Sequence, residues 1–317
     1  MANIIHWTFD NPRDYERAIR LTEVSDLVVS EPGTFKASLT IMNVGRVWLQ
    51  GGNEIVARTM RIAIEDSRRS IAFLADADAA PIIQSGAEFD ADEVVSFGRN
   101  TSHFQRTFGP ISWAAMSLLP GDLEAAVGKI AGREIGEPSA TLRIKPSSAR
   151  LGRLRHLFQE VNRMAFSGEE VLDHPEVRRS LEQTLTVAMV SCLSAEAERS
   201  HGRGWHRHQQ IMQRFREWLD ANHDRAVYLH EVCTALDVSA PTLRRCCEEH
   251  LGMSPMQYLG LRRMNLARQE LQRPDSETSV TATAMNFGFW HLGRFADEYR
   301  SLFGESPSVT LARHSSR

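Results

Sequence analysis

Two segments near the C-terminal end share one pattern of apolar and polar positions. In residues 239–255 and 288–307, apolar side chains recur every three or four positions, a Gly ends the run, and Ser-Pro follows two residues later. The apolar positions are Leu243, Cys247 and Leu251 in the first segment and Leu292, Phe295, Tyr299 and Leu302 in the second. Gly is favoured just beyond a helix end and Pro in the first turn of a helix, so the pattern predicts two similar helical units.

A shorter helix is predicted before each segment, at residues 229–236 and 279–288, and a longer one at 253–272 joins the two units. The turns between the paired helices are short, which makes each pair a candidate helix-turn-helix. A small helical bundle with solvated arginines would give the same spacing in one unit. Two units in tandem with matching Gly and Ser-Pro stops favour a duplicated helix-turn-helix.

Residues 1–119 contain short runs in which apolar and polar residues alternate. The predicted strands cover residues 27–29, 35–44, 47–49, 54–57, 60–64, 70–74, 82–83, 93–97 and 111–118. Asn11-Pro12 begins a short helix that we expect to reach Leu21, because Asn caps helices and Pro fits their first turn. Many short strands with turns between them indicate a barrel or a sandwich.

Helices are predicted next, at 120–130, 147–166 and 175–198, and a Gly-rich polar stretch at 201–208 is predicted as a linker. The chain has 317 residues, too many for one typical core. We therefore expect an α+β protein. Its domain at 1–200 would be a barrel with two long helices, and its domain at 209–317 would be all-helical.

The overall composition does not by itself indicate a partner. Apolar residues make up 42% of the chain, charged residues 24%, and the formal net charge is −3. A DNA-binding surface would have to come from where the basic residues lie, and these are nearly all Arg. No export signal, membrane-spanning stretch or disulfide framework is visible, so we expect a cytoplasmic protein.

Each of the two C-terminal segments leaves an Arg-bearing face outside its apolar stripe. Arg244 and Arg245 lie on this face in the first segment, and His291 and Arg294 in the second. A helix fits the DNA major groove, where an Arg fork can bond O6 and N7 of guanine. In helix-turn-helix proteins the second helix of the pair reads the bases.

The C-terminal third resembles the DNA-binding domain of the AraC/XylS transcriptional regulators. The residues that carry the resemblance are 251–258 (LGMSPMQY), 261–267 (LRRMNLA), 287–289 (FGF) and 295–307 (FADEYRSLFGESP). The resemblance implies seven helices, with the third and sixth in adjacent major grooves. By position it implies DNA contacts from Pro241, Thr242, Arg244 and Arg245, and from His291, Leu292, Gly293, Arg294 and Asp297. Gly293 has no side chain and Leu292 offers only apolar contact, so the second unit should depend mostly on Arg294 and His291.

The N-terminal half resembles the effector-binding half of this family in its order of elements: a cupin-like barrel, then two helices that often make a dimer. The alternative is that both helices close the core of a monomer. The resemblance implies double-stranded DNA, a small-molecule effector, RNA polymerase and a second copy of the chain as partners. Activation is commoner than repression in the family.

The identity of the effector stays open. Arg13 and Arg17 have the Arg-x-x-x-Arg spacing that some cyclic dinucleotide binders use. The barrel region also holds tryptophans and arginines that suit an anionic ligand: Trp7, Trp48, Trp113, Arg46, Arg58, Arg61, Arg68 and Arg69. The plainer interpretation is surface arginines and core tryptophans.

Other chemistry finds little support. Cys246, Cys247 and His250 lie close in sequence, but zinc needs four ligands with repeated spacing, and we expect Cys247 in the core. No phosphate loop, nucleophile elbow or dinucleotide fingerprint is present, so we expect no enzyme, metal or cofactor. The second hypothesis is a ligand- or partner-binding module whose helical domain no longer reads DNA, as Leu292 and Gly293 suggest.

Overall fold

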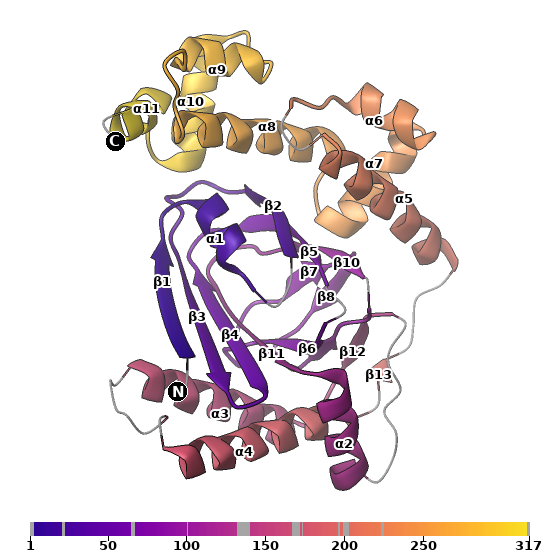
Figure 1. The fold of residues 1–317 in the computed structure, drawn as a ribbon. Helices are drawn as coiled ribbons and strands as arrows, with labels where there is room; N and C mark the ends of the chain where they lie inside the picture. Colours follow the sequence, from indigo (N-terminus) through magenta and orange to yellow (C-terminus); the bar gives the residue numbers. More distant parts are fainter. Residues whose placement is uncertain are drawn as a thin grey trace.

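The computed structural model describes residues 3–20, 23–64, 67–99, 101–131, 140–166, 172, 174–195, 197–198, 203–222 and 225–315 (Figure 1). Within these residues, all strands lie before residue 199, and the part from 203 onward contains only helices and their connections. The expected α+β architecture, with strands first and an all-helical C-terminal domain, is confirmed.

The described residues of the N-terminal domain form two antiparallel sheets. The strands are β1 (Asn3–Phe9), β2 (Glu23–Val29), β3 (Ala37–Val44), β4 (Val47–Glu54), β5 (Arg58–Ala63), β6 (Arg69–Leu74), β7 (Ile82–Gln84), β8 (Ala87–Phe89), β9 (Val94–Ser96), β10 (Ser102–Arg106), β11 (Ile111–Leu118), β12 (Leu142–Ile144) and β13 (Ala197–Glu198). The larger sheet has the order β1-β3-β4-β11-β6-β9-β12-β13 and the smaller β2-β5-β10-β7-β8. Apolar side chains from both sheets, including Leu39, Ile62 and Ile82, fill one core between them.

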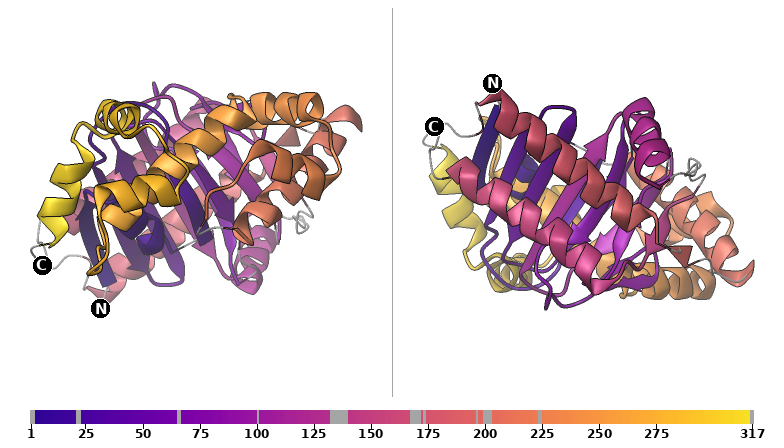
Figure 2. Two further views of the ribbon diagram at one scale, coloured as in Figure 1. Left: turned by 90° about the horizontal axis from the view of Figure 1, so that it is seen from above. Right: turned by 90° about the horizontal axis from the view of Figure 1, so that it is seen from below.

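Three helices cover the outer face of the larger sheet: α2 (Pro120–Ala131), α3 (Ser148–Phe166) and α4 (Pro175–Leu193) (Figure 2, right). Their apolar residues, such as Phe158 and Met189, are buried against the sheet. The Phe158 ring lies directly over Gly51, where a Cβ atom would come within 2.4 Å of the ring. The apolar stripes of α3 and α4 are therefore buried within the chain, as expected if both helices close the core of a monomer.

Two helix ends differ from the prediction. Helix α4 stops at Leu193 and not at Glu198, because Ala197 and Glu198 pair with β12 as strand β13. Helix α1 (Pro12–Ala18) begins as predicted, with the Asn11 side chain accepting from the Arg13 amide, but it stops before Leu21 because Ile19 is already extended. Strand pairing ends α4 and an extended backbone ends α1, although the apolar spacing typical of a helix continues beyond both ends.

The C-terminal domain has seven helices among the described residues: α5 (Arg203–Asp220), α6 (Leu229–Leu236), α7 (Ala240–Leu251), α8 (Pro255–Leu271), α9 (Val280–Asn286), α10 (Leu292–Phe303) and α11 (Pro307–Ser315). The stops inferred from the sequence are present. Gly252 and Gly304 end α7 and α10 in the left-handed conformation, with φ of 63° and 74°. The Ser254 side chain then caps α8 by accepting from the Gln257 amide.

The predicted linker at 201–208 overlaps the start of helix α5. Residues 203–208 belong to α5, and residues 201–202 lie outside the described residues. The helical domain rests directly on the barrel, with α8 running across its top (Figure 2, left). Strand β2 is the principal contact: the side chain of Asn265 accepts from the Val29 amide at 3.1 Å and donates to the Val29 carbonyl at 3.2 Å.

Candidate nucleic-acid interface and interior cavity

Helix α7 presents a polar face to solvent along its first turns. The Ser239 side chain caps the helix by accepting from the Thr242 amide, and Pro241 lies in its first turn. Leu243, Cys246 and Cys247 turn inward and are fully buried. Arg244, Arg245 and Pro241 are exposed and Thr242 is half-buried, so the four candidate contact residues of this unit share one accessible region.

Helix α10 presents its own candidate residues in the same way. His291, Leu292, Arg294 and Asp297 are exposed, whereas Phe295 and Tyr299 are buried. A Cβ atom added at Gly293 would meet nothing within 4 Å, so this glycine leaves open space beside Arg294. His291 is the N-cap residue, but its side chain makes no capping hydrogen bond.

Both helices carry the same local ion pair. The Arg244 Nε donates to the Glu248 carboxylate at 2.7 Å, and the Arg294 Nε donates to the Glu298 carboxylate at 2.7 Å. These carboxylates raise the pKa of each arginine, which therefore stays charged. Exposed pairs of this kind contribute little to stability, so either arginine can exchange its partner for a ligand at little cost.

The two helices do not offer the same chemistry at equivalent positions. Each has 12 residues and ends at a left-handed Gly, so they can be aligned on Gly252 and Gly304. In this alignment Arg294 occupies the position of Thr242, and Asp297 that of Arg245. Both faces bear arginines, as the sequence predicts, but these arginines lie at different positions along the two helices.

One exposed residue at this surface was missed by the sequence analysis. The Trp290 side chain is 78% exposed, and its ring lies 3.7 Å from the His291 ring, at the start of α10. Trp290, His291, Arg294 and the α8 residue Arg263 line a shallow hollow together. The sequence could have pointed to Trp290 through its position, because it is a large aromatic residue just before the N-terminus of a predicted reading helix.

The cysteine cluster belongs to the helical core. Cys246 and Cys247 are fully buried, which confirms the core prediction for Cys247, and His250 is 2% exposed. Burial raises the pKa of the Cys246 thiol to about 11, which keeps it protonated. No group of three or more potential metal ligands occurs in the described part of the chain.

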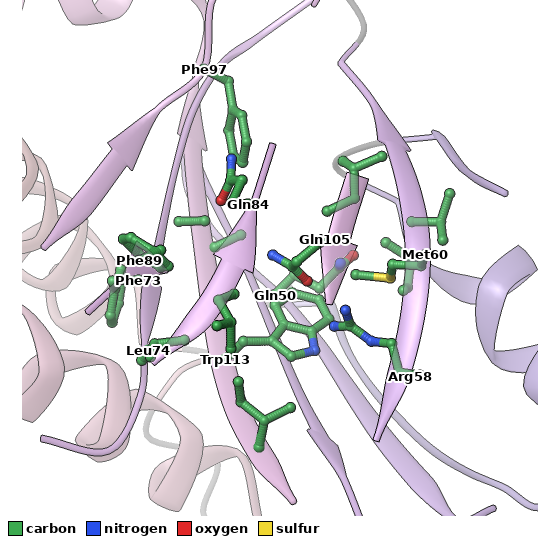
Figure 3. A pocket seen from close by; sticks show the side chains of 17 residues that line it. Gln50, Arg58, Met60, Phe73, Leu74, Gln84, Phe89, Phe97, Gln105 and Trp113 are labelled. Atoms are coloured by element: carbon green, nitrogen blue, oxygen red, sulfur yellow. The ribbon is translucent and has the colours of Figure 1, made fainter. Parts of the chain in front are cut away.

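A cavity lies inside the barrel, between its two sheets (Figure 3). Most of its lining is aliphatic or aromatic: Ile19, Val24, Met60, Ile62, Ala72, Phe73, Leu74, Ile82, Phe89, Phe97, Ile111 and Ala115. Polar side chains gather at one side, where Gln50, Gln105 and Arg58 lie beside the indole of Trp113 (Figure 3).

A buried ion pair supports this polar side. The Arg58 Nε donates to Glu54 Oε2 at 2.7 Å, and its Nη2 donates to Oε1 at 3.3 Å. Glu54 Oε1 also accepts from the Tyr15 hydroxyl at 2.9 Å and the Trp113 indole at 3.0 Å. Burial raises the pKa of Tyr15, so its hydroxyl remains a donor. The remaining Arg58 nitrogen, Nη1, is buried and has no hydrogen-bond partner among the described residues.

The other tryptophans and arginines of the barrel region lie away from this cavity. Trp7 and Trp48 are 36% and 38% exposed, and the Arg68 guanidinium covers the Trp48 ring. Arg61 pairs with Asp220 of α5, and Arg46 pairs with Asp122 and Glu182. On α1, Arg13 donates to Gln269 of α8 at 3.1 Å, and Arg17 is exposed. Arg58 and Trp113 were among the eight residues that the sequence suggested for an anionic ligand, but nothing in the sequence distinguished them from the other six.

The described residues include no helix that is long and apolar enough to span a membrane. The model of a helix-turn-helix domain family matches residues 232–313, a range that includes α7 and α10.

Three relatives illustrate what the chain is similar to. It is 32% identical to the XylDLEGF operon transcriptional activator 2 of Pseudomonas putida, over 41% of this chain and 82% of that protein. The XylDLEGF operon transcriptional activator 1 of the same organism is 37% identical over 31% of this chain and 30% of its own length. A solved structure of a probable AraC family transcriptional regulator from Rhodopseudomonas palustris is 31% identical, with a TM-score of 0.30, over 33% of this chain and 97% of that one.

Proposed function

The chain belongs to the AraC/XylS family of transcriptional regulators, and we propose that it is a sequence-specific activator controlled by a small molecule bound in its barrel. The observation that carries the DNA-reading part is the pair of equal helix-turn-helix units, each with an exposed, Arg-bearing N-terminal face on its second helix. The long helix α8 separates the two units. We therefore assign α7 and α10 to two successive major-groove segments on one side of the DNA.

The candidate contacts divide between bases and backbone. Arg244 and Arg245 suit guanine O6 and N7, whereas Thr242 can donate to a base or a phosphate. On α10 we assign the base and backbone contacts to Arg294 and His291, and an apolar contact with a thymine methyl group to Leu292. We add Trp290 as a contact to the sugar-phosphate backbone, because its exposed ring borders the same hollow as Arg294.

The test is binding of the purified full-length chain to a DNA fragment that carries its own promoter, compared with random DNA at physiological salt. Binding that is tighter on the promoter by at least about 10³-fold, and that weakens as salt rises, supports a sequence-specific regulator. Equal affinity for both DNAs under all conditions would favour the alternative, a ligand- or partner-binding module that no longer reads DNA.

The barrel cavity is our candidate for the effector site. Mostly apolar pockets with a few converging polar groups are typical of small-molecule sites. Val24 lines the cavity, and the same strand, β2, meets the helical domain through Asp26 and Val29. A ligand that repositions β2 would therefore shift how α8 sits on the barrel, and with it the positions of the two reading helices.

A cyclic dinucleotide is a less favoured effector. Such a ligand brings two phosphate charges, and Arg58, the one arginine among the described residues of the cavity lining, is already paired with Glu54. Arg13 and Arg17 lie on α1, whose Arg13 side chain is engaged by Gln269. Arg13 and Arg17 therefore do not line an enclosed site that could hold a cyclic dinucleotide.

The assembly that we propose is a homodimer that binds double-stranded DNA and contacts RNA polymerase in the cytoplasm. Since the apolar stripes of α3 and α4 are buried within the chain, a dimer formed through these two helices would use their outer, mainly polar faces. Sedimentation of the purified protein with and without operator DNA tests whether dimerisation precedes DNA binding.

A further inference from the structure

We propose that the barrel cavity binds a neutral, mainly apolar molecule whose polar group accepts a hydrogen bond from Nη1 of Arg58. This inference rests on the effector site proposed above and narrows it to one class of ligand. It excludes carboxylates, phosphates and other anions as preferred ligands of this cavity.

The walls of the cavity determine the apolar part. Carbon-rich side chains from both sheets, such as Phe89, Phe97 and Met60, line most of it. A ligand gains free energy in proportion to the apolar area that it removes from water, so a hydrocarbon or aromatic body is favoured there. The three glutamines of the lining are uncharged and suit further neutral polar atoms at the edge of such a body.

Arg58 determines the polar part. Its side chain is among the most deeply buried in the protein, with 1% exposure, and Nη1 has no acceptor in the described residues. A buried donor without a partner costs free energy, so a ligand acceptor placed beside Nη1 would stabilise the complex. Carbonyl, ether and hydroxyl oxygens all meet this requirement.

Glu54 determines which net charge of the ligand the cavity favours. Its carboxylate is 1% exposed, bonds Arg58 through two nitrogens, and is held by Tyr15 and Trp113 as well. The Arg58 charge is therefore already balanced inside the protein. An anionic ligand would add a net negative charge to an apolar cavity, which is costly, whereas a neutral acceptor adds none.

A matched pair of probes tests the proposal directly. The compounds 4-phenylbutanamide and 4-phenylbutanoate have nearly the same shape and differ in charge, and their binding to the full-length protein can be measured by isothermal titration calorimetry. We expect the amide to bind at least about 10-fold more tightly than the carboxylate. Equal or tighter binding of the carboxylate, or binding of neither probe, would overturn the assignment.

Two variants sharpen the result. Glu54→Gln has nearly the same shape but leaves the Arg58 charge unbalanced, so it should shift the preference toward the carboxylate. Ala72→Leu is the matched control: it narrows the cavity, so both probes should bind more weakly while their affinity ratio is kept. If Glu54→Gln does not fold, the probe comparison on the unmodified protein still decides the proposal.

The same samples separate this inference from the proposed effector role. If the amide binds selectively but promoter affinity does not change, the ligand class stands and the effector role of the cavity fails. If promoter affinity changes only with the carboxylate, the effector role stands and the ligand class fails.

Discussion

At the scale of residues, the two reading helices have the same ion-pair spacing but different contact chemistry. Arg244 and Arg294 each bond a glutamate four positions later. Arg245, however, is matched by Asp297 when the helices are aligned on their terminal glycines. Arginine donates to guanine, whereas a carboxylate accepts from the amino group of cytosine. The two units should therefore prefer different bases, and the operator should contain two unlike half-segments.

Replacing single arginines tests which residues read bases. Arg245→Ala and Arg294→Ala should each weaken promoter binding by about 1–3 kcal/mol and change random-DNA binding little, if each contacts a base edge. Fluorescence anisotropy on both DNAs measures the difference. Arg300→Ala is the control, because Arg300 is exposed in the last turn of α10, away from the N-terminal face. Equal losses on both DNAs would indicate phosphate contacts.

At the scale of elements, helix boundaries set by local signals were predictable. Ser239 and Ser254 cap α7 and α8 with their side chains, as expected for Ser at an N-cap position. Gly252 and Gly304 end α7 and α10, as expected for Gly just beyond a helix end. Sheet edges were harder. Strand β1 was missed because its residues from Ile4 to Phe9 are all at least partly exposed, so no face of the strand alternates clearly.

The cavity was beyond sequence reasoning for a related reason. Arg58 and Trp113 are far apart in the chain and meet only because β4 pairs with β11 and Glu54 lies at the end of β4. Five barrel arginines looked equivalent in the sequence, and only the strand register decides which one lines the cavity beside the buried carboxylate of Glu54. The contact between Asn265 and Val29 depends on docking of the two domains and left no local signal.

The cap of α10 allows stability and function to be separated. His291 makes no capping bond, so His291→Ser should supply one and stabilise the protein by about 1 kcal/mol. The same change should weaken promoter binding if His291 contacts DNA. Ser239→Ala is the mirror case, because it removes an existing cap and should destabilise the protein by about 0.5–2 kcal/mol. Urea denaturation and anisotropy report the two effects; a gain in both properties for His291→Ser would rule out a DNA contact.

At the scale of the whole molecule, the barrel and the helical domain share a continuous interface. The core between the sheets extends to Met264, Phe295 and Phe303 of the helical domain. Arg262, with 1% exposure, donates to Asp26 at 3.3 Å and to the Asn222 carbonyl at 3.0 Å. Asp26 adopts a left-handed conformation, φ 51°, at a bulge in β2 between the cavity residue Val24 and Val29. One strand thus contacts both the cavity and α8.

Asn265→Ala tests whether this strand couples the two domains. The change leaves the buried backbone N–H and C=O of Val29 without their Asn265 partner, so the protein should lose about 1–3 kcal/mol of unfolding free energy. Promoter affinity without a ligand should stay within about threefold, since the Asn265 side chain is buried and bonds Val29 of β2 and not a residue of α7 or α10. The change in promoter affinity on adding 4-phenylbutanamide should shrink or vanish, because β2 would no longer be tied to α8.

A second interface residue provides the control for this experiment. Arg273 pairs with Asp14 of α1 at 3.1 Å, but both side chains are about half exposed, so Arg273→Ala should change stability by less than about 1 kcal/mol and leave ligand coupling intact. Loss of coupling in both variants would mean that any weakening of the interface suffices. Full coupling in Asn265→Ala would show that the signal from the cavity reaches the reading helices by a route other than β2.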